Sequence, residues 1–395
     1  MKAPEVFERT TSIITGSKNL LKVWDLPNLP FTEFFGEYDS TFPKVSQALM
    51  MCPETGVFQL QREVDSKFLY NSKNYNFRTL RNPKISRELD FFVKSSSLDL
   101  IMNAESRILE IGGNDTELAD KLKNHFSKYV VCDPILDDQV IGSIEHWGGT
   151  IEERMDLVEE FQPTVIIGRH VLEHLSSPLT LLKGLMNRIR GKVIFVFEFP
   201  NFRLMQQRQR FDAVFHQHLN YFDEHSIQKL ISSLECKLLS IHSNLEGSNG
   251  GSLVVSFTND LDCHSLDTLD IQPFSGNAKD NFDISLKLFE SQANLLTETI
   301  AAWKGEKFGF GAGLMLSTLN YHLNGEVEKF SAIFDDDETK VNSRYQNLDV
   351  EIQSASKFVD AEKNLVLITS MENQRRLRNR LMDFPKSTII GFQIG

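Results

Sequence analysis

The sharpest change from apolar to polar positions falls in the middle of the chain. Residues 107–111 form a short, mostly apolar run that ends at Gly112 and Gly113, and a polar helical segment follows. This order predicts a strand, a turn and a helix. A second apolar run at 130–132 leads to Asp133, whose carboxylate is placed to accept hydrogen bonds from ribose hydroxyls. The two runs predict a nucleotide-binding α/β crossover, in which the glycines let a ligand approach the backbone and the helix amides.

Strand-like and helix-like segments continue to alternate around this crossover. Residues 85–102 show the pattern of an amphipathic helix. Nearly continuous apolar runs at 164–168 and 191–200 predict strands that are buried in a sheet. Strands that alternate with helices are typical of an α/β fold with a largely parallel sheet.

The N-terminal part of the chain is less regular. Glycines and prolines interrupt residues 1–80, and only 57–61 has the pattern of a strand. We therefore expect a small irregular domain that is held together by apolar contacts. The candidates for these contacts are Phe31, Phe34, Phe35 and Phe42.

The C-terminal part predicts a second α/β unit. A long amphipathic helix at 284–303 leads into the glycine-rich segment 307–313, and apolar runs at 330–334 and 365–369 predict strands. The spacing of the glycines and an acidic strand end is typical of a Rossmann-like unit, although the third glycine of a dinucleotide fingerprint is missing. The predicted domains are 1–80, 81–264 and 265–395.

Composition and charge narrow the class of protein. The 395 residues allow two or three domains of about 100–200 residues each, and 41% apolar residues with 30 Phe supply ample core material. A net charge of −12 without a Lys/Arg cluster disfavours nucleic-acid binding. No apolar run reaches the ~18 residues of a membrane span, and the N-terminus lacks the apolar core of a signal peptide. Four scattered cysteines favour a reducing cytoplasm. The oligomeric state stays open.

The glycine turn carries a more specific signal. Glu110 stands before the glycines and Asn114 after them, and an acidic strand end suits a cationic sulfonium better than a pyrophosphate. The pattern resembles motif I of the class I S-adenosylmethionine-dependent methyltransferases. This resemblance implies S-adenosylmethionine as cofactor and S-adenosylhomocysteine as product. The implied cofactor-binding residues are Glu110, Gly112, Gly113, Asn114, Asp133 and Pro134. The alternative is an ordinary strand–helix turn that binds nothing.

The segment Phe211-Asp-Ala-Val-Phe-His-Gln-His-Leu-Asn-Tyr-Phe222 is the most specific stretch in the chain. It resembles the element Phe-Asp-x-x-Tyr-His-Glu-His-Leu-Ser-Tyr-Phe of the nucleotide-sugar 3-C-methyltransferases. The resemblance implies that His218 is the catalytic base. It also implies that His216 belongs to the catalytic residues, with a structural role as the alternative, and that Gln217 and Tyr221 contact the substrate.

Three further segments match the same family. Residues 169–178 resemble its element beside the methionine part of the cofactor, which makes His174 a cofactor-binding residue, with capping of buried backbone as the alternative. Glu198, at the end of a predicted strand, implies a substrate contact or a salt bridge. Tyr75 and Phe77 fall on two pocket tyrosines of the family. Tyr75 is implied to be catalytic and Phe77 to line the substrate pocket, unless these rings simply pack between domains.

The chemistry of C-methylation explains why a histidine is wanted. A carbon next to a ketone becomes nucleophilic only after it loses a proton, and an imidazole with a pKa near 6.5 suits that task at neutral pH. This chain departs from the family at Gln217, Phe215 and Phe77, which replace a glutamate and two tyrosines. Glutamine cannot take up a proton, and phenylalanine cannot stabilise an enolate oxygen by a hydrogen bond.

The outer domains depart from the family as well. Its N-terminal zinc ligands fall on Ser12, Thr15, Cys52 and Thr55, and one thiolate cannot build a structural zinc site, so we expect no zinc and no other metal. The C-terminal domain of the family helps to bind the sugar nucleotide, which makes Gly311 and Asp335 substrate-binding candidates.

These observations predict a methyltransferase that acts on a nucleotide-linked keto-sugar or a similar small molecule, without nucleic-acid or membrane partners. An O- or N-methyltransferase of a related acceptor is one alternative. A relative that has lost its activity and only binds ligand is the other.

Overall fold

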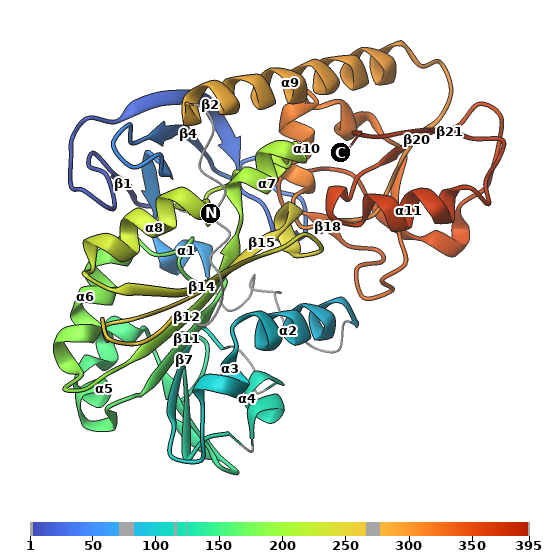
Figure 1. Cartoon of the computed structure of the whole chain (residues 1–395). Coiled ribbons are helices and arrows are strands. Elements are labelled where there is room, and N and C mark those ends of the chain that lie inside the picture. Colours follow the sequence, from blue (N-terminus) through green and yellow to red (C-terminus); the bar gives the residue numbers. More distant parts are fainter. Residues whose placement is uncertain (1–2, 71–82, 114–116, 124, 266–276, 394–395) are drawn as a thin grey trace.

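The computed structural model describes residues 3–70, 83–113, 117–123, 125–265 and 277–393. A mostly parallel eight-stranded sheet forms its centre (Figure 1). In spatial order the strands are β14 (Lys237–Asn244), β15 (Ser252–Thr258), β12 (Ile194–Pro200), β11 (Val165–Arg169), β7 (Arg107–Ile111), β8 (Lys128–Asp133), β10 (Ile144–Gly148) and β9 (Gln139–Ile141). From β12 to β10 the neighbours run parallel, whereas β15, β14 and β9 join antiparallel to their neighbours. The predicted α/β fold is confirmed.

Helices cover both faces of this sheet and complete a three-layer arrangement (Figure 1). One face packs against α5 (Met155–Phe161), α6 (Pro178–Arg188) and α8 (Glu224–Ser233). The other face packs against α2 (Pro83–Ser95), α3 (Leu98–Ile101) and α4 (Glu117–Leu122). The helix predicted at 85–102 is therefore two helices, because Ser97 adopts a left-handed φ of 53° between them. The short helix α7 (Phe202–Gln207) follows β12.

The N-terminal part contains more regular structure than its sequence predicts. The strands β2 (Leu21–Pro30), β4 (Lys44–Met51), β5 (Phe58–Leu60) and β13 (Asn220–Tyr221) form an antiparallel sheet. Pro27 does not interrupt the sheet because β2 is its edge strand, with register irregularities between Lys22 and Trp24 and between Leu26 and Leu29. The strand β1 (Val6–Glu8) pairs with β6 (Arg62–Val64), and α1 (Ser66–Leu69) follows.

Apolar contacts hold this part together as expected. Phe31, Phe34 and Phe42 are buried in one cluster, and their rings meet at centroid distances of 5.2–6.4 Å. Phe35 behaves differently, because its ring packs on Tyr345 of the C-terminal part at 4.6 Å. The strand β3 (Phe35–Gly36) also pairs with β18 (Arg344–Tyr345) there.

The C-terminal part is a second doubly wound unit, as predicted. Its parallel sheet has the order β19 (Ile352–Ser354), β17 (Ala332–Asp335), β16 (Lys307–Phe310), β20 (Leu365–Ile368) and β21 (Thr388–Ile390). The helices of this unit are α10 (Leu316–His322) and α11 (Gln374–Leu381). The predicted domain boundaries at residues 80 and 264 stay a prediction.

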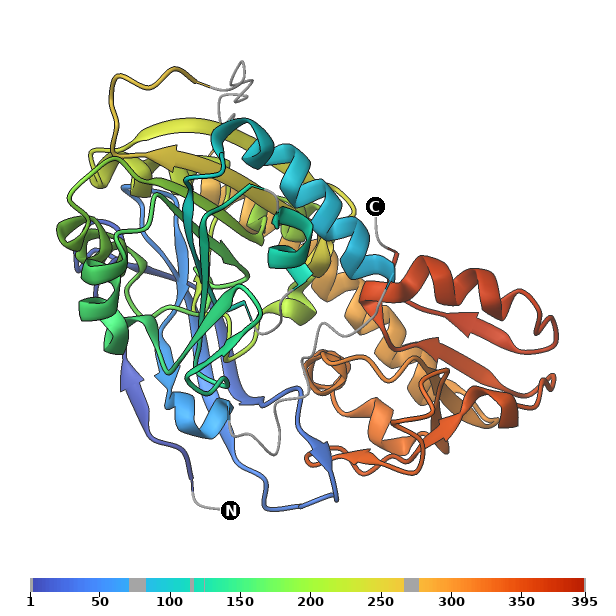
Figure 2. The ribbon, with the colours of Figure 1, turned by 90° about the horizontal axis from the view of Figure 1, so that it is seen from below.

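The long helix α9 (Ala278–Ala302) joins the parts of the molecule. Figures 1 and 2 show it running from the N-terminal sheet to the C-terminal unit. Its buried face packs against both the N-terminal sheet and the C-terminal unit. The ring centroids of Phe282 and Phe58 are 5.2 Å apart, and those of Phe289 and Phe392 are 5.3 Å apart. None of the helices in the described residues is both long and apolar enough to cross a lipid bilayer.

A buried ion pair adds a second connection between the central and C-terminal parts. Arg210 is 3% exposed and donates to Asp212 at 2.8 and 3.1 Å and to Glu372 at 2.5 Å. The backbone amide of Asn249 donates to the same Glu372 carboxylate at 3.1 Å. Because one guanidinium neutralises two carboxylates here, its loss would leave Asp212 buried without a cation.

We predict that Arg210→Leu lowers the free energy of unfolding by about 3–5 kcal/mol, because breaking a buried ion pair from one side leaves an uncompensated charge. Urea unfolding measures this change. Arg190→Leu is the matched control, because it removes an ion pair on the surface: the Arg190 side chain is 79% exposed and lies 3.7 Å from the Glu159 carboxylate. A loss below about 0.5 kcal/mol in Arg210→Leu would contradict the prediction.

Candidate active site

The glycine turn after β7 lies where the strand order of the central sheet reverses. The chain proceeds from β7 to β8 and β10 on one side and then returns to β11 and β12 on the other. Open α/β sheets bind ligands outside the carboxyl ends of the strands at this switch point. Gly112 has a φ of 70°, and an added Cβ would lie 2.7 Å from Val171, in the loop after β11. An added Cβ on Gly113 would lie 2.7 Å from Val131 and 2.8 Å from Glu110.

The acidic residues predicted to bind the cofactor differ in their surroundings. Asp133 ends β8 and is 7% exposed, and its carboxylate accepts a hydrogen bond from the Ile135 amide at 2.9 Å. The Glu110 carboxylate is 4% exposed and accepts from the Tyr129 hydroxyl at 2.6 Å. Pro134 is exposed. Asn114 lies outside the described residues.

The loop after β11 brings His174 to the same edge of the sheet. Its ring Nδ1 donates to the backbone oxygen of Gln217 at 2.8 Å and lies 3.2 Å from the Tyr70 hydroxyl. This hydrogen bond fixes the proton on Nδ1 and leaves Nε2 with a free lone pair. Burial is the largest influence on the pKa of His174 and lowers it.

Residues 211–221 cross the site between two sheets. The backbone amide of Leu219 donates to the backbone oxygen of Glu173 at 2.7 Å, and β13 directly follows as a strand of the N-terminal sheet. His218 therefore lies beside His174, with ring centroids 4.9 Å apart. Burial and then the neighbouring His174 and His170 hold the pKa of His218 well below 6.5, so its imidazole is neutral at pH 7.

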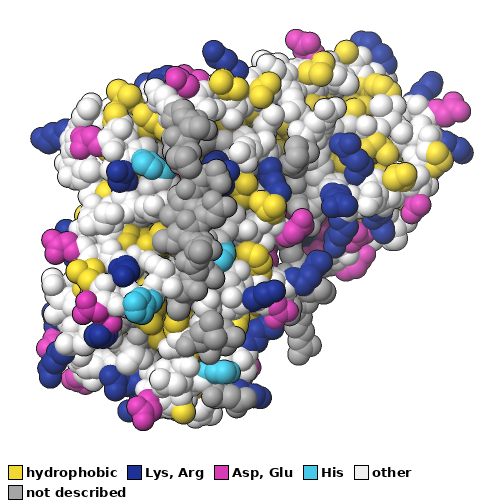
Figure 3. All heavy atoms as spheres, in the orientation of Figure 1, with side chains coloured by type: hydrophobic (Ala, Val, Ile, Leu, Met, Phe, Trp, Pro, Cys, Tyr) yellow, Lys and Arg dark blue, Asp and Glu magenta, His cyan; other side chains and the backbone are white. Residues whose placement is uncertain are grey.

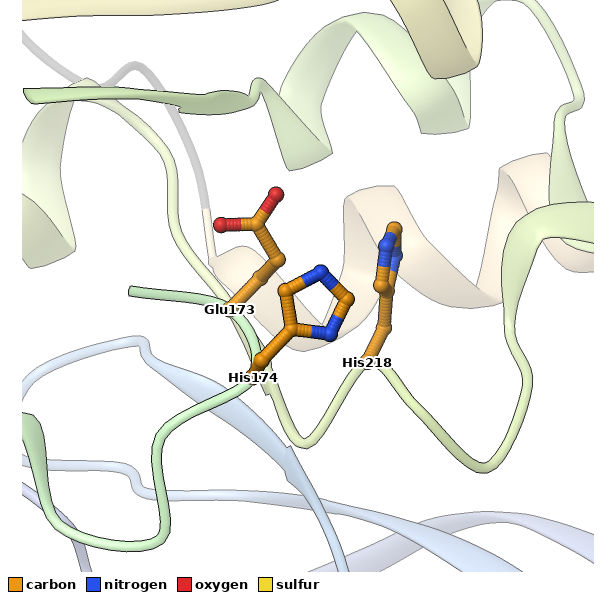
Figure 4. A group of neighbouring side chains, drawn as sticks. All are labelled: Glu173, His174 and His218. Atoms are coloured by element: carbon orange, nitrogen blue, oxygen red, sulfur yellow. The ribbon is translucent and has the colours of Figure 1, made fainter. Parts of the chain in front are cut away.

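Glu173, His174 and His218 form one group, which we call the histidine cluster (Figure 4). One nitrogen or oxygen from each side chain lies within 4.8 Å of the others. Glu173 is 1% exposed; its Oε1 accepts from His170 Nδ1 at 3.1 Å, and its Oε2 has no hydrogen-bond partner among the residues described. Two imidazoles and a carboxylate are a donor set that can bind a divalent metal. The expectation that the protein holds no metal stays a prediction.

His216 occupies a different environment from His218. It is fully buried, its Nε2 donates to the Leu29 oxygen at 3.1 Å, and its Nδ1 accepts from the Gln47 amide at 3.2 Å. Burial lowers the pKa of His216 to about 4. Because both nitrogens bind the N-terminal sheet, this geometry favours the structural role that the sequence leaves open.

The residues of the central part that are predicted to contact the substrate lie in different environments. Glu198 is 1% exposed, accepts from Ser252 at 2.7 Å and pairs with Arg169 at 2.8 Å. Its carboxylate thus forms the salt bridge that was the alternative to a substrate contact. Tyr221 is buried in β13, 6.4 Å from the His218 ring. Tyr75 and Phe77 lie outside the described residues.

The C-terminal unit has a pocket of its own at the carboxyl ends of its strands. It encloses about 350 Å³, and both Gly311 and Asp335 line it together with Lys340 and Arg376. The pocket lies at the switch point between β16 and β20. Lys and Arg side chains gather near α11 on this face of the molecule, next to acidic ones (Figure 3).

The four residues that the resemblance aligns with zinc ligands lie together in the N-terminal part. The Cys52 sulfur lies 4.0 Å from the Thr15 hydroxyl, and two tight turns are closed by Gly16 N to Ser12 O and Gly56 N to Cys52 O. Burial raises the pKa of the Cys52 thiol, but hydrogen bonds from the Ser12 and Thr55 hydroxyls outweigh it and lower the pKa overall. One thiol with three hydroxyls does not fit a tetrahedral structural zinc.

Comparisons with known proteins agree with the central fold. Residues 77–241 match the family model of a methyltransferase domain. The predictions of a methyltransferase and of S-adenosylmethionine as its cofactor are confirmed for this part of the chain. The comparison with curated proteins gave no match.

Solved structures resemble about half of the chain. The N-methyltransferase NodS from Bradyrhizobium japonicum, solved in complex with S-adenosyl-L-homocysteine, is 14% identical with a TM-score of 0.34, covering 50% of this chain and 100% of that one. A methyltransferase from Mesorhizobium loti is 10% identical, with a TM-score of 0.32 and coverage of 43% and 99%. YcgJ from Bacillus subtilis is 11% identical, with a TM-score of 0.31 and coverage of 44% and 98%. At these values the similarities carry no functional argument.

Sequence reasoning missed two residues of this region. Glu173 could have been found, because it directly precedes His174 in the matched segment. Glu33 gives no local signal, because it reaches the site only through the fold: Gln217 donates to its carboxylate at 3.3 Å.

We predict that the triple variant Ser12→Cys, Thr15→Cys and Thr55→Cys binds zinc and unfolds at a higher temperature than the wild type. Four thiolates on two tight turns restore a tetrahedral donor set, and metal binding stabilises the folded state. Metal analysis and thermal unfolding measure the two effects. The single variant Ser12→Cys is the control, and a triple variant with no more zinc than this control would contradict the prediction.

Proposed function

We propose that the protein transfers the methyl group of S-adenosylmethionine to a nucleotide-linked keto-sugar, with His218 as the base that prepares the acceptor carbon. The observation that carries this proposal is the histidine cluster at the switch point of the methyltransferase sheet. It places a neutral, buried imidazole next to the loop that contacts the glycine turn. The reaction would take place in the cytoplasm, where the four cysteines stay free thiols.

The residues present fit the proposed cofactor. Gly112 and Gly113 leave no room for a Cβ at the turn, and Asp133 offers a carboxylate at the end of β8. When bound, S-adenosylmethionine supplies an electrophilic methyl group on a sulfonium. His174 lies on the same edge, with Nε2 free to contact a ligand.

His218 would accept the proton from the acceptor carbon, while the electron pair of the broken C–H bond moves toward the ketone oxygen. The neutral ring has a lone pair available for this step at pH 7. The protonated ring would be stabilised by the nearby Glu173 carboxylate, whose Oε2 has no other hydrogen-bond partner in the described part of the chain. The cluster thus combines a base with a counter-charge.

The C-terminal pocket supports a nucleotide-linked acceptor. Lys340 and Arg376 offer positive charge to phosphates, and Asp335 and the backbone after Gly311 offer hydrogen-bonding groups. This assignment extends the substrate roles that the resemblance gives to Gly311 and Asp335.

O-methylation is a second candidate, favoured by a specific contact. The Phe215 ring lies 4.3 Å from the His218 ring, where the family has a tyrosine hydroxyl to support an enolate oxygen. A base could remove a hydroxyl proton without such support, because the charge then stays on the oxygen that attacks.

Incubation with methyl-labelled S-adenosylmethionine and a panel of sugar nucleotides tests the proposal. In deuterated water, C-methylation goes with exchange of the proton at the reacting carbon, whereas O-methylation leaves that carbon protonated. Absence of label in every acceptor would count against both reactions and favour a protein that only binds ligand.

Two variants separate chemistry from cofactor binding. We expect His218→Ala to reduce methyl transfer by about a thousandfold and to leave the affinity for S-adenosylhomocysteine nearly unchanged. Asp133→Ala should weaken that affinity, measured by calorimetry, because it removes the carboxylate for the ribose hydroxyls. Parallel loss of transfer and affinity in His218→Ala would show that the residue is structural.

A further inference from the structure

The loop between β2 and β3 brings a carboxylate to the histidine cluster. Glu33 is half-buried, and Gln217 donates from Nε2 to its Oε2 at 3.3 Å. Gln217 also touches the cluster, because its backbone oxygen accepts the hydrogen bond from His174. One residue therefore links Glu33 to the imidazoles, although Glu33 is more than 180 positions away in the sequence.

The backbone of Glu33 is held in an unfavourable conformation. Its φ is 72°, in the left-handed region that residues other than glycine seldom adopt. Contacts on both sides impose this conformation: the Glu33 amide donates to the Leu314 oxygen at 3.3 Å, and the Gln346 amide donates to the Phe34 oxygen at 2.9 Å. Thr32 also donates to the Leu314 oxygen. A backbone conformation of this kind persists only where surrounding contacts hold it, and such residues are concentrated at functional sites.

The chemistry around Glu33 suits a neutral carboxylic acid. Within the described residues its carboxylate forms no ion pair, and burial raises the pKa of Glu33 to about 7. The titratable side chains of the neighbouring segments bind elsewhere. Lys340 donates to the Ala312 oxygen at 3.0 Å, Tyr345 donates to the Gly313 oxygen at 2.8 Å, and His216 binds Leu29 and Gln47. His218, the next residue after Gln217, is neutral.

The partner of Glu33 has an unused acceptor. Gln217 is 3% exposed, and its Oε1 has no hydrogen-bond partner in the described parts of the chain. A buried amide oxygen without a partner is costly, unless a ligand supplies the missing donor. An acid hydrogen next to an amide oxygen is a donor–acceptor pair that matches a keto oxygen and an adjacent hydroxyl of a sugar.

We propose that Glu33 is a catalytic residue of this site: it donates a hydrogen bond to the reacting oxygen of the acceptor sugar, while Oε1 of Gln217 accepts one from a neighbouring sugar hydroxyl. This inference rests on the proposed function. Glu33 would donate a hydrogen bond from its acid O–H to the acceptor oxygen, without transferring the proton, while that oxygen gains negative charge. It would thereby supply a hydrogen-bond donor, which the Phe215 side chain cannot provide.

Activity as a function of pH tests this role. As pH rises through about 7, Glu33 loses its proton and can no longer donate, so kcat of the wild type should fall. Glu33→Gln keeps an N–H donor that does not titrate and should lose this alkaline decline. Glu33→Ala should lower kcat by about a hundredfold below pH 7, because it removes the donor altogether, and its deficit relative to the wild type should shrink as the pH rises above 7.

Two controls keep the result specific. Glu37→Gln, on the exposed surface of the same segment, should keep the wild-type pH profile. The affinity of all variants for S-adenosylhomocysteine should match the wild type, which shows that they fold and keep the cofactor site. Infrared difference spectra of wild type minus Glu33→Gln should show one carboxylic acid that titrates near pH 7 without any turnover.

The outcomes distinguish this inference from the proposed function. Methyl transfer by the wild type, with the same alkaline decline in Glu33→Gln, overturns the role of Glu33 and leaves the proposed function standing. Transfer by no variant to any sugar nucleotide overturns the proposed function and this role with it. An infrared band that titrates at the ordinary pH of a glutamate also overturns the role.

Discussion

The site depends on how residues 211–221 are fixed between two sheets. Hydrogen bonds hold this segment on both sides: His216 binds the edge strand β2, β13 extends the N-terminal sheet, and the Leu219 amide donates to the backbone oxygen of Glu173. Arg9 secures the same segment, because its guanidinium donates to the Leu219 oxygen at 2.7 Å and to the Asn220 side chain at 2.7 Å. Leaving such buried groups unpaired would cost about 1–3 kcal/mol each, so His218 has one well-defined position.

Apolar contacts and hydrogen bonds fix the shape of the N-terminal part. Hydroxyls around Cys52 hydrogen-bond where thiolates would bind zinc, and α9 packs the sheet against the rest of the molecule. The same part then contributes to the site, through the contacts of its β2–β3 segment with Gln217 and with the C-terminal unit.

Local patterns predicted the elements well where the chain is buried and regular. The strands at β7, β8, β11 and β12 and the long helix α9 follow directly from apolar periodicity. The pattern failed for β2, because this edge strand tolerates proline and an irregular register and therefore alternates poorly. The same pattern predicted one helix in place of α2 and α3, because apolar spacing does not reveal the left-handed residue Ser97 between them.

The sequence by itself determined the methyltransferase core, the glycine turn, the acidic strand end and the two histidines of the matched segment, because these are local features of neighbouring residues. Only the tertiary structure decided what surrounds each imidazole. It bound both nitrogens of His216 and left His218 beside His174 and Glu173. It also brought Glu33 to Gln217, since hydrogen bonds between distant segments depend on how whole sheets pack and leave no trace in local spacing.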